Sequence, residues 1–306
     1  MEGGATIRDM NNAAVEGGAT GCFNKEKIMS IDVFSILIFV GSLTAGFLGA
    51  LTGLGGGVVI VPLLTLVFGV DIRYAIGASL VSVIATSSSA AAAYVKEGFS
   101  NIRLGMFLEM ATTFGALIGA TLAGMISTQI IAVIFGIVLL YSAYLSTRGH
   151  SPATTADTPD FLANSLHLDS SYPSSNGLVS YHVRAIPTGF SLMFLAGALS
   201  GLLGIGSGSV KVLAMDQAMH VPFKVSTTTS NFMIGVTAAA SAGIYLTRGY
   251  IDPGLAMPVM LGVVLGSLFG SRVLVSSKPR LLRIIFAGVI LVLGLEMIYN
   301  GLMGWL

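Results

Sequence analysis

Two glycine clusters decide the fold of this chain: Gly53-Leu54-Gly55-Gly56-Gly57 and, 151 residues later, Gly204-Ile205-Gly206-Ser207-Gly208. The stretches that contain them, residues 45–123 and 196–274, align without a gap, and roughly twenty of about eighty positions are identical. A chain built from two copies of one apolar unit, each interrupted by glycines near its start, is typical of transporters. Such proteins bind substrate where their repeats meet, on backbone that a helix break has freed.

The composition is that of a membrane protein. Hydrophobic residues make up 54% of the chain and charged residues 9%, and the mean hydropathy is +0.87. Soluble domains carry about 25% charged residues. The apolar segments are near the length that the hydrocarbon core requires, and backbone polar groups in lipid must be bonded within the chain, which favours helices. The segments lie near residues 31–52, 57–69, 74–95, 103–124 and 127–146, and again near 185–203, 208–220, 225–246, 254–275 and 281–302.

These segments predict an all-α integral membrane protein that is multi-pass and located in the cell membrane. It has two homologous halves of four to five helices each, so eight to ten segments, each half with a short glycine-broken helix, related by a pseudo-twofold axis. The expected parts are a polar tail at 1–30, a first transmembrane repeat at 31–146, a polar linker at 147–184 and a second repeat at 185–306. The linker is rich in Ser, Thr, Pro and Asp, and we expect it to be flexible. Its three histidines, at spacings of 17 and 15, match no compact metal site, so no metal is expected.

Orientation follows from lysine and arginine in short loops. The loop at 276–283 carries Lys278, Arg280 and Arg283 with no acid, which indicates the cytoplasm, whereas the linker carries more acids than bases. If all ten segments crossed, both loops would lie on one side. The charge bias therefore favours eight crossings and halves of equal orientation, although Lys25 and Lys27 favour a cytoplasmic N-terminus.

The glycine clusters are candidate substrate-lining segments. Consecutive glycines let backbone N–H groups approach a ligand, and a helix that starts just after them offers an anion site. We therefore assign Gly55, Gly56 and Gly57, and in the second copy Gly206, Ser207 and Gly208, to substrate binding. The alternative is close helix packing.

Packing accounts well for other glycines of the chain. Gly115 and Gly119, like Gly262 and Gly266, are four residues apart and so share one helix face. A nucleotide-binding loop is not indicated, because no strand precedes either cluster and no Gly-Lys-Ser/Thr follows.

Five polar side chains in the apolar segments extend the candidate site. Ser230 and Asn231 can donate hydrogen bonds to an oxyanion without the cost of burying a charge. Lys211 stands in the first turn of a short helix, where the helix dipole does not favour a cation. Either an anionic substrate or Asp216 could compensate the positive charge of Lys211. Glu109, like Asp216, is a candidate for coupling transport to an ion, and for Glu109 a structural pairing is the alternative.

At these residues the chain resembles the TauE/SafE sulfite-exporter family of membrane permeases. The resemblance is carried by the first glycine cluster with Pro62, by Val210-Lys211-Val212 after the second cluster, and above all by the run from Val221 to Thr237. It covers about 31–302. The family is a duplicated-repeat group of transporters of sulfite, sulfonates and other sulfur-containing anions. Ser207 departs from it, since the family commonly has glycine there.

The sequence therefore predicts a secondary transporter that moves small sulfur-containing anions, such as sulfite or organosulfonates, across the cell membrane. No ATP-binding motif is present, so an ion gradient or the membrane potential would drive it. Its expected partners are sulfite or a sulfonate, the lipid bilayer and a second copy in a homo-oligomer, with no cofactor. The net charge of +1 gives no indication of nucleic acid. The alternatives are an anion channel, a transporter of another small organic anion and, less favoured, an intramembrane enzyme, for which the apolar segments offer no cysteine or histidine pair.

Overall fold

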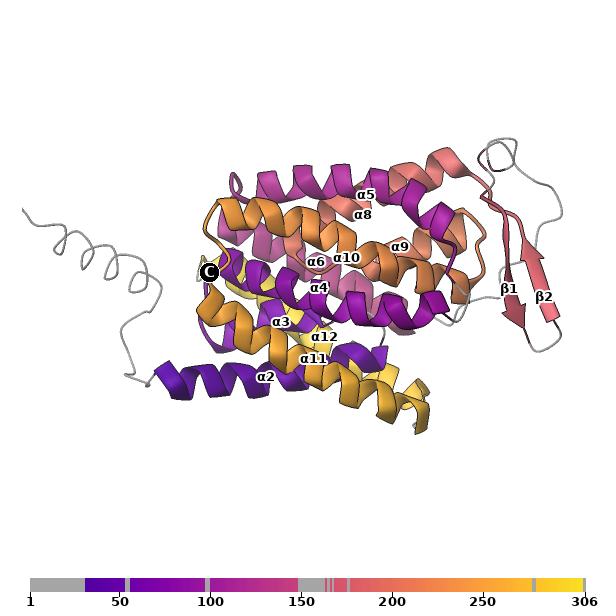
Figure 1. Cartoon of the computed structure of the whole chain (residues 1–306). Coiled ribbons are helices and arrows are strands. Elements are labelled where there is room, and N and C mark those ends of the chain that lie inside the picture. Colours follow the sequence, from indigo (N-terminus) through magenta and orange to yellow (C-terminus); the bar gives the residue numbers. More distant parts are fainter. Residues whose placement is uncertain are drawn as a thin grey trace, which may run out of the picture.

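The computed structural model describes residues 31–52, 56–96, 100–147, 163, 166, 168–174, 177–276 and 279–304. This part of the chain forms a helical bundle with a β-hairpin at one end (Figure 1). The elements of the first half are α2 (Ile31–Thr52), α3 (Gly57–Pro62), the π-helix η1 (Leu63–Val67), α4 (Ile72–Lys96), α5 (Ile102–Ala123) and α6 (Thr128–Thr147). Those of the second half are α8 (Ile186–Leu203), α9 (Gly208–Leu213), the π-helix η2 (Ala214–Ala218), α10 (Phe223–Thr247), α11 (Pro253–Ser276) and α12 (Pro279–Met303).

Each predicted apolar segment is a helix in the structure, displaced by a few residues at most. The short second segment of each half is the glycine-broken helix that the sequence indicates. It forms α3 with η1 in the first half and α9 with η2 in the second, so both change from α-helix to π-helix after six residues.

Two of these helices, Ile102–Ala123 and Ile186–Leu203, are long and apolar enough by themselves to cross a membrane. Six further apolar helical stretches of 10–17 residues occur among the described residues.

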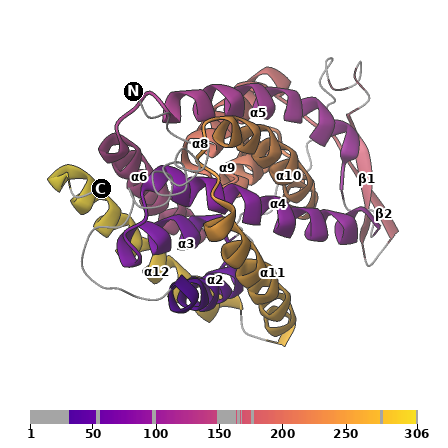
Figure 2. The same cartoon turned by 60° about the vertical axis from the view of Figure 1, so that its left-hand side comes forward.

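Glycines bring helices of the two halves into close contact. Helix α5 packs on α8, and α2 lies along α11, as Figures 1 and 2 show. A Cβ atom on Gly115 would overlap the carbonyl oxygen of Phe194, and one on Gly119 would overlap that of Ala198. On the other helix pair, a Cβ on Gly262 would lie 2.5 Å from the carbonyl oxygen of Phe39. The packing role predicted for these glycines is confirmed, since small residues let membrane helices approach closely.

Neighbouring contacts also give the directions of the helices. Thr112 lies beside Gly197 and Ala116 beside Gly201, so α5 and α8 run parallel. The contacts between α5 and α10, and those between α2 and α11, occur in the same order along both helices, so each of these two pairs is also parallel. Because α10 and α11 are joined by a short loop and run antiparallel, α8 runs opposite to α2 (Figure 1).

The predicted equal orientation of the halves is therefore wrong. The chain reverses its direction after each of the five segments of the first half, including the short segment α3–η1. Because five is an odd number, the second half begins in the direction opposite to that of the first. The charge bias failed because it relied on the long linker, and long connections report orientation poorly.

Part of the linker is folded, so the expectation of a flexible segment is wrong there, although the bundle itself is all-α as predicted. Strands β1 (Ser170–Ser174) and β2 (Gly177–Tyr181) pair in antiparallel register. Asn101, the N-cap of α5, donates from its amide to the Leu168 carbonyl and to the Tyr181 hydroxyl, both at 2.9 Å. Burial raises the pKa of Tyr181 to about 12, so this hydroxyl is neutral at pH 7. These bonds hold the hairpin to one end of the bundle.

We expect Gly115→Ala to destabilise the protein and Gly243→Ala to leave it as stable or slightly more stable. A Cβ at position 115 overlaps the α8 backbone, and such overpacking costs about 1–3 kcal/mol. A Cβ at Gly243, also inside a helix, meets no atom within 4 Å, and alanine is the better helix former by about 1 kcal/mol. Thermal unfolding in detergent micelles measures both. Equal melting temperatures for the two variants would show that the contact between α5 and α8 is not a constraint.

Candidate functional site

The two glycine clusters lie next to each other, and both contact α4. The Ser79 hydroxyl donates to the Gly204 carbonyl at 2.8 Å, and a Cβ on Gly57 would lie 3.1 Å from the same oxygen. In the second half, the Ser230 hydroxyl donates to the Gly208 carbonyl at 3.3 Å. Gly55 lies outside the described residues. Both clusters thus adjoin in the interior of the bundle, as a site formed between repeats requires.

The second cluster has an unusual backbone. Gly204, Gly206 and Ser207 have φ of 67°, 71° and 41°, in the left-handed region that favours glycine. At Ser207, which is not glycine, this conformation is strained. Its hydroxyl donates to the Ala196 carbonyl on α8 at 2.6 Å. In this structure the hydroxyl therefore anchors the cluster to α8 rather than facing a substrate.

Apolar side chains fill the space beside the clusters. A Cβ on Gly206 would lie 2.9 Å from Ile234 and 3.3 Å from Val83, and both of these side chains are buried. A Cβ on Gly56 would lie 2.8 Å from Val263. The described backbone near the clusters is therefore packed, so a ligand would enter only if Val83 and Ile234 moved apart.

A buried ion pair lies one turn beyond the second cluster. Lys211 on α9 is 0% exposed, and its Nζ is 4.0 Å from Oε2 of Glu109 on α5. The ammonium donates to the hydroxyl of Thr237 on α10 at 2.5 Å, and that hydroxyl lies 2.7 Å from Oε1 of Glu109, to which it donates. Three helices thus converge on one charged contact. The lysine pairs with Glu109 and not with Asp216, which was the alternative partner.

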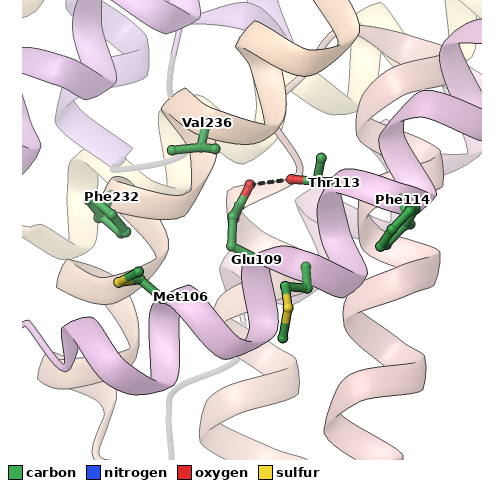
Figure 3. A pocket seen from close by; sticks show the side chains of 7 residues that line it. Met106, Glu109, Thr113, Phe114, Phe232 and Val236 are labelled. Carbon is green, nitrogen blue, oxygen red and sulfur yellow. Dashed lines mark hydrogen bonds between the residues drawn. The ribbon is translucent and has the colours of Figure 1, made fainter.

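The carboxylate of Glu109 is only partly satisfied. Its Oε1 accepts from Thr237 and, at 3.2 Å, from Thr113 on its own helix (Figure 3). Its Oε2 is buried and has no hydrogen-bond partner among the described residues. A buried acceptor without a partner is costly, so this oxygen is suited to accept a proton or a ligand donor.

The remaining predicted residues lie on α10 and η2 and have no hydrogen bond to this pair among the described residues. Ser230 is buried and Asn231 half-buried on α10, and Asp216 is buried on η2. Sequence reasoning did not single out Thr237, which connects Lys211 to Glu109. One signal for it exists: Thr86 occupies the equivalent position of the first copy, 151 residues earlier, so the two copies share this hydroxyl.

Comparison with known proteins identifies the family of the chain. Residues 37–297 match the family model described as sulfite exporter TauE/SafE. The chain belongs to the TauE/SafE family. Among curated relatives, the probable membrane transporter protein YunE of Bacillus subtilis is 30% identical over 278 residues, which are 88% of this chain and 98% of YunE. The probable membrane transporter protein MJ0441 of Methanocaldococcus jannaschii is 26% identical over 86% of this chain and 94% of its own.

These relatives establish this TauE/SafE member as a membrane transporter. The probable membrane transporter protein YjnA of Bacillus subtilis is 28% identical over 88% of this chain and 100% of its own length. No solved structure matches the chain.

We expect Lys211→Met to lower the free energy of unfolding by about 3–5 kcal/mol, because it leaves Glu109 buried without its cation. Adding Glu109→Gln should restore most of that loss, since the charge is then removed from both partners. Combining Lys211→Met with Asp216→Asn instead should not restore the free energy of unfolding. Chemical unfolding of the three variants in detergent measures these differences, and rescue by Asp216→Asn would show that the lysine pairs with Asp216.

Proposed function

We propose that this protein is a secondary transporter of small sulfur-containing anions such as sulfite or organosulfonates, and not an enzyme. The anion binds beside Lys211, between the second glycine cluster and α10. The family to which the chain belongs is described as sulfite exporters, which supports the substrate class.

One observation carries the proposal: the ammonium of Lys211 is completely buried, yet the nearest oxygen of its ion-pair partner Glu109 is 4.0 Å away, too far for a hydrogen bond. A buried charge is costly unless it is paired and hydrogen-bonded. The ammonium can donate three hydrogen bonds, and Thr237 accepts one. A small oxyanion would supply both the missing charge and the missing acceptors. Gly208, at the start of α9, and Ser230, on α10, are joined by a hydrogen bond and would line the anion site.

The symmetry of the contacts supports a pseudo-twofold relation between the halves. The contact of Gly115 with Phe194 recurs, 151 positions apart, as that of Gly266 with Leu43. The close contact of Gly197 with Thr112 recurs in the same way, as that of Gly46 with Val263. We propose that the halves form an inverted repeat, in which rocking of one half against the other exposes the site alternately to each side.

The charged pair breaks this symmetry. The positions equivalent to Lys211 and Glu109 are Ile60 and Met260. The transporter would therefore hold one anion site, displaced from the axis toward α9, rather than two equivalent sites.

Glu109 is proposed as the coupling group. When Glu109 is ionised, it competes with the anion for Lys211. When it takes up a proton, the lysine loses this partner and attracts an anion more strongly. Binding of one proton thus favours binding of one anion, so a pH gradient would drive the anion in the direction of proton flow.

We expect Lys211→Gln to weaken sulfite binding roughly ten- to a hundredfold, the equivalent of a charge-assisted hydrogen bond of about 1.5–3 kcal/mol. Glutamine can still donate to Thr237, but the variant, like Lys211→Met, leaves Glu109 without its cation, so affinities are compared at equal amounts of folded protein. Lys211→Arg should recover part of the affinity, because the guanidinium keeps the charge but is longer and planar. Uptake of labelled sulfite and of a sulfonate into proteoliposomes measures this. Unchanged affinity in Lys211→Gln would contradict the site, and flux that neither saturates nor exchanges with internal substrate would indicate a channel.

Glu109→Gln should retain saturable transport but lose its response to an imposed pH gradient. The amide imitates the protonated carboxyl and keeps the bonds to Thr113 and Thr237. The measurement compares initial uptake rates with and without the gradient. Equal stimulation of the variant and the parent protein would exclude Glu109 as the coupling group.

A further inference from the structure

The charges of the buried ion pair balance when no substrate is bound. Lys211 carries one positive charge and Glu109 one negative charge, and their side chains are 0% and 8% exposed. Because Nζ and Oε2 are 4.0 Å apart, the two charges offset each other. A net charge inside a membrane protein is costly, so the empty site is in its favourable state when it holds this balance.

The described surroundings of the pair offer no second cation to balance an added anion. Helix α8, which packs on α5, contains no ionisable side chain. Arg103 and Lys224, near the starts of α5 and α10, are exposed. In the described part of the chain Asp216 on η2 is the remaining buried charged residue, and it is an acid. Any charge that enters the site must therefore be balanced at Lys211 or Glu109.

The possible states of the site differ in net charge. A singly charged anion added to the ion pair leaves one net negative charge, whereas a proton added to Glu109 alone leaves one net positive charge. When both bind, the charge of Lys211 is offset by the anion, and Glu109 is neutral. A doubly charged anion leaves one net negative charge even when Glu109 is protonated. Charge balance thus selects one proton together with one monovalent anion.

We propose that this transporter moves one proton together with one singly charged oxyanion, hydrogensulfite or an alkylsulfonate, so that transport carries no net charge. The inference rests on the proposed function of the Lys211–Glu109 site and narrows its substrates to monovalent anions. The proton binds a carboxylate oxygen of Glu109, and the anion binds the ammonium of Lys211. A site that holds only one of the two carries a net charge and does not reorient, which makes the coupling obligatory.

Thr237 allows the pair to accept the proton without breaking the connection between the helices. Its hydroxyl accepts from Lys211 and lies 2.7 Å from Oε1 of Glu109, but it also lies 2.9 Å from the carbonyl oxygen of Met233 on its own helix. A hydroxyl has one proton and can donate to one of these acceptors at a time. When Glu109 is protonated, the hydroxyl donates to Met233 and accepts from the carboxyl group. Both protonation states of Glu109 thus keep a hydrogen bond between α5 and α10.

Uptake of labelled methanesulfonate into proteoliposomes tests the charge balance. A fixed pH gradient, acid outside, drives uptake, while potassium and valinomycin set the membrane potential to zero, inside positive or inside negative. We expect the same initial rate at each potential, and the uptake of one proton per anion as measured with an internal pH dye. Rates that change severalfold with the potential would overturn the proposal.

Glu109→Gln should make transport depend on the membrane potential. The amide is neutral like the protonated carboxyl, so the loaded site stays balanced, but the empty site carries the charge of Lys211 alone. Each cycle then moves one negative charge inward, and an inside-positive potential of about 100 mV raises the accumulation of anion by up to roughly fiftyfold. The comparison is made within one variant, so it does not depend on the amount of folded protein. Uptake by Glu109→Gln that ignores the potential would contradict the proposal.

Two further variants serve as matched controls. Glu296→Gln makes the same chemical change at an exposed carboxyl on α12, and Asp216→Asn removes the other buried acid of the described chain. Uptake by both should remain independent of the potential. Dependence on the potential in Asp216→Asn would assign the proton to Asp216 and overturn the role of Glu109.

Sulfate and methanesulfonate compare two charges at nearly constant size, since a methyl group replaces one oxygen. We expect sulfate to compete with labelled methanesulfonate roughly tenfold more weakly, because its second charge is not balanced in the site. Equal competition would overturn the restriction to monovalent anions. If neither methanesulfonate nor sulfite shows saturable uptake, the proposed function fails and this inference with it. Saturable uptake that follows the potential in the parent protein would overturn this inference alone.

Discussion

The close approach of α5 to α8 is the contact on which the rest of the structure depends. Glycines at 115 and 119 leave no side chain between α5 and the carbonyl oxygens of Phe194 and Ala198. Because α5 belongs to the first half and α8 to the second, this contact fixes the halves relative to each other. It also sets the position of Glu109, which lies less than two turns before Gly115 on α5.

A buried charge in an apolar bundle demands a partner, and only the assembled halves provide it. Lys211 is contributed by the short helix after the second glycine cluster, Thr237 by α10 and Glu109 by α5. Thr237 and Glu109 each make one hydrogen bond within their own helix, but the charges of Lys211 and Glu109 find a partner only between helices. The pair therefore joins the halves electrostatically at the level where the glycines join them sterically, and it leaves one carboxylate oxygen unbonded among the described residues. That remaining oxygen is what makes the contact a candidate for function rather than for stability alone.

The same carboxylate faces two different environments. On the inner side it meets the ammonium of Lys211, and on the outer side it adjoins an apolar groove between α5 and α10 that is lined by Met106, Met110 and Phe232. A change on either side alters the electrostatic balance on the other, because the interior has a low dielectric constant.

The sequence by itself determined the number and position of the helices, the glycine breaks and the duplication, because apolar runs, glycines and the 151-residue repeat are local or periodic signals. It also indicated that Lys211 needs compensation and that Glu109 either couples transport to an ion or forms a structural pair. It could not pair them with each other, since they are 102 positions apart and their contact depends on how α5 and α9 pack. Tertiary structure likewise decided the opposite directions of the halves and the hairpin formed by Ser170–Tyr181. Both depend on contacts between distant segments, such as the bond from Asn101 to Tyr181, that no local pattern specifies.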